Sequence, residues 1–188
     1  MKRRYELKAR AEKQADTRRR IVEAAVGLHT TVGPAATSIS AIAESAGVQR
    51  HTVYAHFPDE ATLFGACSAH WTAANPFPDT SGWFAETDPE RRLRAALSAV
   101  YEWYEHVESA LTLFARDAEA VPANVRDARV AQLGVLADAL TVGRSRRKVV
   151  RAALGHALAF QTWRSLVRQE GLSRRQAVDA MVRFVANA

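Results

Sequence analysis

The sequence predicts an all-α protein in which a small helix-turn-helix domain precedes a larger helical domain. Apolar residues recur at helical spacing along almost the whole chain, and alternating strand patterns are scarce. The segment ISAIAESAGVQRHTVYAHF, residues 39–57, holds two short helical patterns on either side of one glycine. The stretch NPFPDTSGWFAETDP, residues 75–89, has the prolines and glycine of a loop and is the only convincing boundary in the chain.

The composition fits a folded protein with a basic front end. Of 188 residues, 48% are hydrophobic, but no apolar run reaches the length of about 18 that indicates a membrane span. No apolar segment follows the basic N-terminus, so no secretory signal is predicted. The single cysteine, Cys67, excludes an internal disulfide and favours a reducing cytoplasm. We therefore expect a cytoplasmic protein.

The net charge of +6 comes from one end of the chain. Residues 1–20 contain nine Lys or Arg and three acids, whereas the remainder carries 17 basic and 17 acidic residues. A neutral body with a basic front end suggests that this end meets a polyanion. The alternative is a solvated tail that keeps the protein soluble.

Caps and breakers mark the helices of the first third of the chain. Ser, Thr and Asp begin helices, and a glycine followed by proline ends one. These signals predict helices over about residues 17–32, 38–46, 48–57 and 60–74, with caps at Asp16 or Thr17, at Thr37 or Ser38, and at Asp59. Beyond the loop, apolar stripes and stop signals predict helices over about residues 93–104, 109–120, 125–142, 145–169 and 173–186.

The pair of short helices at residues 39–57 has the steric pattern of a helix-turn-helix. Ala43 is small enough for two helices to cross closely, and Gly47 can take positive φ in the turn. Val48 and Val53 would then anchor the second helix on the first. In this motif the second helix lies in the DNA major groove. Six polar groups on or beside that helix suit DNA better than a core hairpin: Gln49, Arg50, His51, Thr52, Tyr54 and His56.

Residues 15–64 resemble the N-terminal DNA-binding domain of the TetR family of one-component bacterial repressors. The matching segments are RRRIVEAAVGL, GPAATSISAIAESAGV and TVYAHF, of which the last is the most specific. The resemblance implies a basic tail over residues 1–14, a helix-turn-helix domain over 15–64, and a helical effector-binding and dimerisation domain over 65–188. The second half agrees with the family in the number, length and order of its helices.

The resemblance also implies which residues contact DNA. Gln49, Arg50 and His51 would face base edges, and Arg50 is the best candidate for reading guanine because its fork matches O6 and N7. Phosphate contacts would come from Thr37, Ser38, Thr52, Tyr54 and His56. The alternative for Tyr54 and His56 is that they cap the small core with a polar tip outward.

Two positions depart from the family pattern. Glu60 stands where the family usually has a phosphate-binding lysine, so we expect Arg18, Arg19 and Arg20 to take over part of that contact. His29 stands where the family usually has phenylalanine. A partly buried, hydrogen-bonded histidine is the first interpretation, and a pH-sensing role is the alternative.

The resemblance implies a homodimer, since two recognition helices about 34–36 Å apart read a palindrome. Its interface would lie on the last two long helices and include Leu154, Leu158, Gln161, Met181 and Phe184. The alternative is that these residues form the chain's own core.

The resemblance places a small-molecule site among the aromatic residues of the second half. Ligand pockets are mostly apolar with a few polar groups. The candidates are Trp103, Tyr104, His106, Phe114, Phe160 and Trp163. Aromatic residues at helical spacing are also common in cores, which is the alternative for each of them.

The function that these features predict is sequence-specific transcriptional regulation, with a repressor that binds a palindromic operator as a dimer and is released by a small molecule. An effector-independent DNA-binding protein and a transcriptional activator are the alternatives. An enzyme is not expected, because no phosphate loop, Gly-x-Ser-x-Gly elbow or metal-ligand spacing is present. The sequence suggests no cofactor and no metal.

Overall fold

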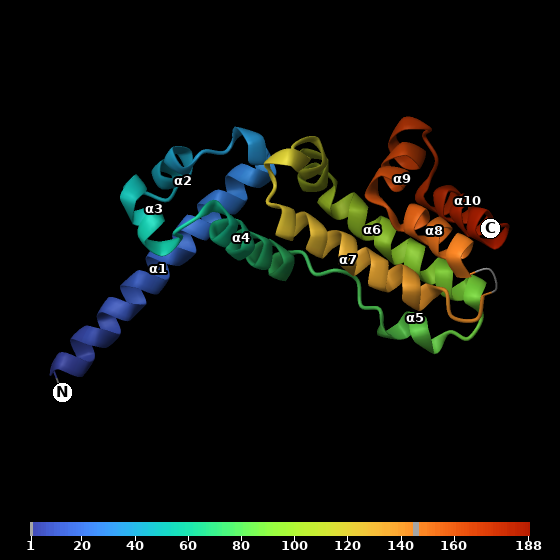
Figure 1. Ribbon diagram of the computed structural model, residues 1–188, viewed down its shortest axis with the longest axis horizontal. Coiled ribbons are helices and arrows are strands. Elements are labelled where there is room, and N and C mark those ends of the chain that lie inside the picture. The colour runs from blue at the N-terminus through green and yellow to red at the C-terminus, as the bar shows by residue number, and fades with distance from the viewer. Residues whose placement is uncertain (1, 145–146) are drawn as a thin grey trace. The chain divides into compact units, whose positions relative to one another are not determined.

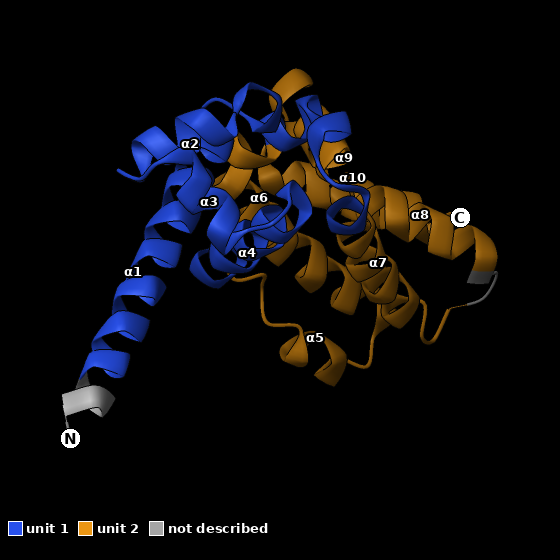
Figure 2. Ribbon diagram, turned by 60° about the vertical axis from the view of Figure 1, so that its left-hand side comes forward, with its two compact units in different colours: residues 1–75, 112–126 blue, residues 76–111, 127–188 orange. Residues whose placement is uncertain are grey.

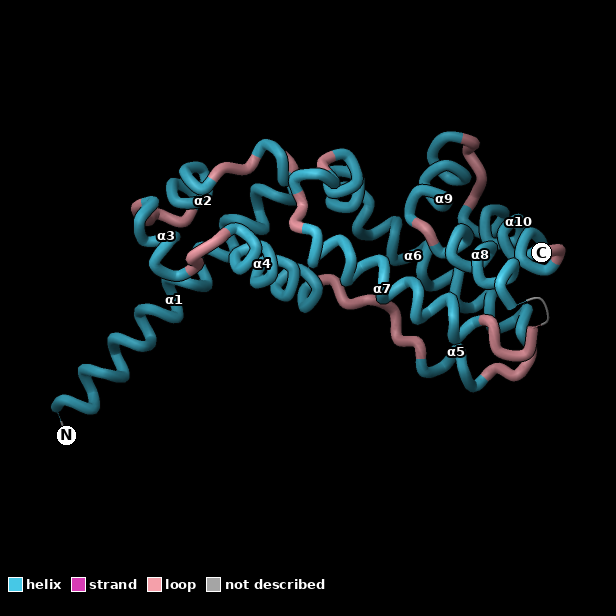
Figure 3. The backbone as a smooth tube through the Cα atoms, viewed as in Figure 1, coloured by secondary structure: helices cyan, strands magenta, loops and turns pink. Residues whose placement is uncertain are grey.

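The computed structural model describes residues 2–144 and 147–188, and over these residues the regular structure is helical with no strand (Figures 1 and 3). The fold class is therefore the predicted one. The chain divides into two compact units (Figure 2). Unit 1 comprises Met1–Asn75 and Thr112–Arg126, and unit 2 comprises Pro76–Leu111 and Asp127–Ala188. The predicted domain limits at residues 15, 64 and 65 remain predictions.

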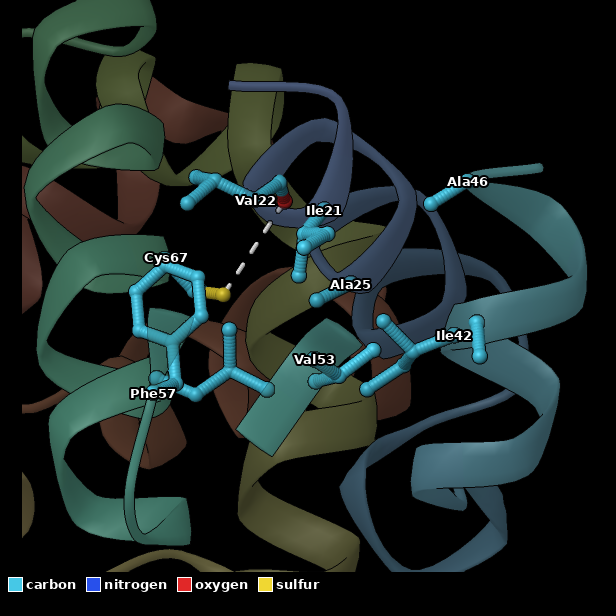
Figure 4. Packing of buried hydrophobic residues seen from close by; sticks show 10 residues of the cluster. Ile21, Val22, Ala25, Ile42, Ala46, Val53, Phe57 and Cys67 are labelled. Atoms are coloured by element: carbon cyan, nitrogen blue, oxygen red, sulfur yellow. Dashed lines mark hydrogen bonds between the residues drawn. The ribbon is translucent and has the colours of Figure 1, made fainter. Parts of the chain in front are cut away.

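Unit 1 is built on helices α1 (Lys2–Thr31), α2 (Ile39–Ser45), α3 (Arg50–His56) and α4 (Glu60–Ala74). Their apolar faces meet in one cluster, shown in Figure 4. Fully or almost fully buried members come from all four helices and the segment after α3, and include Ile21, Ala25, Ile42, Val53, Phe57 and Leu63. Burying apolar surface stabilises a fold by about 25 cal/mol per Å², whereas a helix of seven residues is not stable alone. Packing in this cluster therefore holds the two seven-residue helices in place.

Helix α1 is much longer than predicted. It begins at Lys2 instead of near Asp16 or Thr17, so the tail over residues 1–14 is helical from its second residue. The segment is rich in Ala, Glu, Lys, Arg and Gln, which are good helix formers, and has no glycine or proline before Gly27. Lys8 and Glu12 add an ion pair at i,i+4. Because residues 6–16 are all exposed, no apolar stripe revealed this part of the helix.

The caps and turns of unit 1 follow local sequence chemistry closely. The Ser38 hydroxyl accepts from the Ala41 backbone N–H at 3.1 Å, and the Asp59 carboxylate accepts from the Thr62 backbone N–H at 2.6 Å. These contacts confirm Ser38 and Asp59 as the caps of α2 and α4. Gly47 has φ 63° in the turn, as its position predicted. Helix α3 starts at Arg50, two residues later than expected.

Unit 2 contains α5 (Ser81–Ala85), most of α6 (Pro89–Arg116) and of α7 (Ala123–Leu140), and then α8 (Arg147–Leu158), α9 (Phe160–Arg164) and α10 (Arg174–Ala186). Helix α6 is continuous, so the prediction of a separate helix over 109–120 is wrong. No glycine or proline interrupts it between Pro89 and Arg116. The loop at residues 75–89 carries the short helix α5, whose Trp83 is buried.

The helix predicted over residues 145–169 is broken, and its first two residues lie outside the described ones. Helix α8 ends at Leu158, Ala159 takes extended angles of φ −71° and ψ 137°, and a π-turn spans Ser165–Gln169 after α9. The Tyr101 hydroxyl donates to the Ala157 carbonyl at 2.8 Å, and the Tyr104 hydroxyl donates to the Leu158 carbonyl at 2.6 Å. These bonds satisfy carbonyls that the end of a helix leaves free.

The last helix and the cysteine match expectation. Ser173 caps α10 in a reciprocal capping box with Gln176, which confirms the predicted start. Cys67 is buried in unit 1, and burial raises the pKa of its thiol to about 12. Over the described residues, no helix is both long enough and apolar enough to cross a bilayer.

Candidate DNA-binding surface and effector region

The turn between α2 and α3 is fixed by backbone and core contacts. The Val48 N–H donates to the Ala43 carbonyl at 2.9 Å across the turn, and Gly47 supplies the positive φ that this closure needs. Ile42 and Ala43 are buried on α2, and Val53 is fully buried on α3. One face of α3 is therefore held on the core of unit 1, which leaves its other face for contacts outside the chain (Figure 4).

The outer face of α3 carries the residues predicted to meet bases. Gln49, Arg50 and His51 are exposed, as is Tyr54, with 43% of its surface accessible. The Arg50 guanidinium lies 3.2 Å from the Tyr54 hydroxyl and 5.7 Å from its ring centroid, one helical turn away. This contact restricts the rotamers of Arg50 and uses one donor of its guanidinium, which leaves the remaining N–H groups for other acceptors. Tyr54 does not cap the core.

The residues predicted to contact phosphates differ in their exposure and in their hydrogen bonds. Thr52 and His56 on α3 are half-buried. At the start of α2, Ser38 is exposed and its oxygen accepts the capping hydrogen bond, so its own proton stays available for an anion. The Thr37 hydroxyl donates to the Gly33 carbonyl at 2.8 Å. Thr37 is thus engaged inside unit 1, and Ser38 is the freer donor.

The three arginines of α1 differ in their surroundings. Arg18 is exposed and lies 4.6 Å over the Phe57 ring. Arg19 pairs with Asp16 at 2.5 Å and Glu23 at 2.9 Å, and the hydrogen bond to Glu23 raises its pKa most. Arg20 donates to the Ala46 carbonyl at 2.9 Å, next to the turn. Its Nε lies 3.3 Å from Asp16 without hydrogen-bond geometry.

These surroundings separate their roles. Arg20 supports the end of α2, and Arg19 is already neutralised by two acids. Arg18 is the one of these three whose guanidinium has no acidic partner among the described residues. Glu60 is exposed in the first turn of α4 beside the Asp59 cap. Two acids at this helix start make it a poor phosphate site.

His29 lies at the other end of unit 1, inside its core. It is only 5% exposed and stacks on Phe64 with ring centroids 4.5 Å apart, while Phe114 from the end of α6 approaches edge-on at 6.4 Å. Its Nδ1 is buried without a hydrogen-bond partner among the described residues, so the expected hydrogen bond is absent at that atom. Burial lowers the His29 pKa from 6.5 to about 4.

Two further contacts tie the end of α6 to the turn after α1. The Arg116 guanidinium donates to the Val32 carbonyl at 2.8 Å, and the Asp117 carboxylate accepts from the Ala35 backbone N–H at 3.1 Å. Between them lies Gly33, with φ 97°. All of these residues belong to unit 1.

The candidate effector residues fall into two groups. Phe114 belongs to unit 1, whereas Trp103, Tyr104, Phe160 and Trp163 form a row of ring contacts in unit 2 with neighbouring centroids 5.3–5.8 Å apart. His106 is exposed on α6 and enters none of the ring contacts described for this row. The sequence missed Arg129 of α7, whose guanidinium lies 4.9 Å over the Trp103 ring. Polar and apolar residues are interspersed along α7, so the sequence pattern does not indicate that this arginine faces inward.

The candidate dimer residues differ in exposure. Leu154 and Leu158 are fully buried within the single chain, so their side chains contact its own core. Met181 is half-buried, and Gln161 and Phe184 are exposed, Phe184 by 47%. A depression of about 880 Å³ lies between α8 and α10 and is lined by Val149, Ala153, His156, Ala180, Arg183 and Phe184, among others. An interface there would use these exposed neighbours and not the two leucines.

Taken with the fold, this geometry defines a helix-turn-helix DNA-binding protein. Residues 21–67 match the family model of bacterial regulatory proteins of the tetR family. This segment, which carries the helix-turn-helix, is thus similar to the DNA-binding head of tetR-family transcriptional regulators. None of the curated proteins compared with it matches the chain.

Solved structures extend the likeness in fold to the whole chain. A TetR-like transcriptional regulator from Rhodococcus sp. RHA1 is 19% identical, with a TM-score of 0.62 over 91% of this chain and 94% of its own. NalD, the secondary repressor of the MexAB-OprM multidrug efflux pump in Pseudomonas aeruginosa, is 21% identical, with a TM-score of 0.63 over 94% and 96%. The multidrug binding protein EbrR, complexed with imidazole, is 22% identical, with a TM-score of 0.53 over 89% and 93%.

Proposed function

We propose that this regulator is a repressor that binds a palindromic operator as a homodimer and is released by a small molecule. The observation that carries the proposal is the exposed polar face of α3, held on the core of unit 1 by the buried Val53 and by the Gly47 turn. A polar helix face of this kind fits the major groove. The match to the tetR family over residues 21–67 supports the same function.

Features of unit 2 and of similar proteins support the proposed dimer and the proposed effector. The exposed Phe184 and the depression between α8 and α10 offer an apolar surface that a second copy would cover. Two recognition helices related by a two-fold axis would then meet half-sites about one helical turn apart. NalD is a repressor and EbrR a multidrug binding protein, which favours a small-molecule-responsive repressor here.

Selection of bound fragments from random DNA tests the function directly. A repressor of this kind should enrich one palindromic sequence with half-sites about 10 base pairs apart. A monomeric protein, or one that ignores every duplex at low ionic strength, would contradict the proposal.

Replacing Arg50 with alanine should reduce sequence preference more than general DNA affinity. A bidentate arginine–guanine contact is worth about 1–3 kcal/mol of discrimination, so affinity for the selected operator should fall about tenfold or more, with little change on random duplex. Titration of both duplexes measures the two affinities. Arg91→Ala, at an exposed arginine of unit 2, serves as the control. Equal losses on both duplexes would place the base contact elsewhere.

Removing residues 1–14 should weaken binding to all sequences alike. This part of α1 carries Lys2, Arg3, Arg4, Lys8, Arg10 and Lys13 and lies outside the core cluster, so its loss should leave the melting temperature of the rest nearly unchanged. Each lost phosphate contact lowers the slope of log affinity against log salt by about 0.9. Affinity measured at several salt concentrations gives this slope. An unchanged slope would mean that the segment only solvates the protein.

A further inference from the structure

Arg129 is placed unusually for an arginine. It is half-buried on α7 in unit 2, with its guanidinium 4.9 Å over the Trp103 ring and 5.6 Å over the Phe77 ring, and beside the Tyr104 hydroxyl. Its one side-chain hydrogen bond to a carbonyl oxygen goes to Gln132 Oε1, at 3.0 Å. Among the residues that the structure describes, no aspartate or glutamate pairs with it, in contrast to Arg94, Arg151, Arg168 and Arg174 of the same unit.

The positive charge of Arg129 is unfavourable in this half-buried position unless an anion binds next to it. Removing a guanidinium from water is costly, and contacts with two aromatic faces offset only part of that cost. In agreement, burial is the main cause that lowers the pKa of Arg129. The site therefore has a cation, an apolar wall of aromatic rings and no acid to balance the charge.

A polar group in the same row of rings has no hydrogen-bond partner among the described residues. Trp163 is fully buried, and its Nε1–H has no acceptor among the described residues. A buried N–H without an acceptor is unfavourable, so native structures satisfy most such donors. The Trp163 ring lies 5.8 Å from Tyr104, the residue that also contacts Arg129. Two donors that could use an acceptor thus both lie beside Tyr104.

The backbone that carries Trp163 is irregular. It lies on α9, between the break at Ala159 and the π-turn at Ser165–Gln169. Single π-turns occur often at functional sites because they aim side chains that a regular helix would place elsewhere.

We propose that the effector of this regulator is an organic anion with an apolar body, whose acid group binds Arg129 and whose body packs against Phe77, Trp103 and Tyr104. The Trp163 N–H supplies a further donor to an acceptor atom on the same molecule. A carboxylate, sulfonate or phosphate oxygen pair matches the guanidinium fork. This inference rests on the proposed function, because it names the chemical class of the ligand that would release the protein from DNA.

Two fluorescent probes that differ mainly in charge test the inference. The anion 1-anilinonaphthalene-8-sulfonate and the neutral N-phenyl-1-naphthylamine share the same aromatic body. The native protein should bind the sulfonate about tenfold or more tightly than the neutral probe, because charge-assisted bonds to arginine are strong. Equal affinity for both probes, or no binding of the sulfonate, overturns the proposal.

Variants at position 129 locate the charge. Arg129→Gln should lose the preference for the sulfonate and keep its affinity for the neutral probe, whereas Arg129→Lys should retain most of the preference. Arg126→Gln, one turn earlier on α7 and exposed, should behave as the native protein. Melting curves confirm that each variant is folded. Equal loss of both probes in folded Arg129→Gln would make Arg129 a packing residue and overturn the proposal.

Measurements of operator binding in the presence of the sulfonate distinguish a failure of this inference from a failure of the proposed function. The sulfonate should weaken binding of the native protein to the selected operator and leave that of Arg129→Gln unchanged. If the protein binds no operator, the proposed function fails, while the probe preference still reports on Arg129. If operator binding is intact and the sulfonate shows no preference, the anion proposal alone fails.

Discussion

Replacing Gly33 with alanine is expected to lower the free energy of unfolding by about 2–4 kcal/mol. Gly33 has φ 97° and ψ 160°, a conformation almost confined to glycine that costs a residue with a Cβ about 1–3 kcal/mol. The added methyl group would also collide with the Arg116 guanidinium and the Asp117 carboxylate. Displacing these groups breaks their bonds to Val32 and Ala35, each worth about 1 kcal/mol or more.

Thermal and denaturant unfolding measure this loss, and Gly27 provides the matched control. Gly27 lies within α1, and a Cβ added there would meet nothing within 4 Å. Gly27→Ala should therefore stabilise the protein by about 0.5–1 kcal/mol through helix propensity. A Gly33→Ala protein as stable as the native one would show that Arg116 and Asp117 move aside without loss.

Replacing His29 with phenylalanine should stabilise the protein, most strongly in acid. Phenylalanine keeps the stacking on Phe64 and removes the buried Nδ1 that has no partner, a gain of about 1–3 kcal/mol at neutral pH. The gain should grow as the pH falls, because the native protein must hold His29 neutral.

The sign of this pH dependence follows from the two pKa values. His29 titrates near 6.5 when unfolded and near 4 when folded, so the unfolded chain takes up its proton first. The native protein keeps full stability from this group above pH 6.5. It loses stability progressively between pH 6.5 and 4, by about 3 kcal/mol at most.

Unfolding measured from pH 7 to pH 4 checks the slope. His29→Phe should remove the fall in stability over this range, and His70→Phe, at an exposed histidine of α4, should leave it in place. A native protein with the same stability at pH 7 and pH 4.5 would contradict the buried neutral histidine.

The elements that the sequence predicted well depend on local chemistry. Ser38, Asp59 and Ser173 were recognisable as caps, and Gly47 as a turn residue, because each acts within four residues of its partner. The same local pattern placed the polar face of α3. The DNA-binding surface could therefore be predicted before the packing of the chain was known.

The features that could not be predicted from the sequence either depend on contacts between residues far apart in the chain or have no apolar pattern. The break at Ala159 falls at a strong helix former and is stabilised by hydroxyl groups of Tyr101 and Tyr104, more than fifty residues away. The first half of α1 has no apolar stripe, and its residues 6–16 are all exposed. The position of Arg129 could not be predicted either, because its aromatic neighbours come from other segments of the chain.

The buried position of Cys67 makes the native chain a ready template for site-specific labelling. With its thiol pKa near 12, the single cysteine stays protonated at neutral pH and reacts slowly with maleimide and methanethiosulfonate reagents, because these electrophiles are attacked by thiolates. A cysteine introduced at the exposed Ala55 of α3 would react first, without removal of the native one. Spin labels attached there would give the separation of the two reading heads in an assembled pair, with and without an added anion.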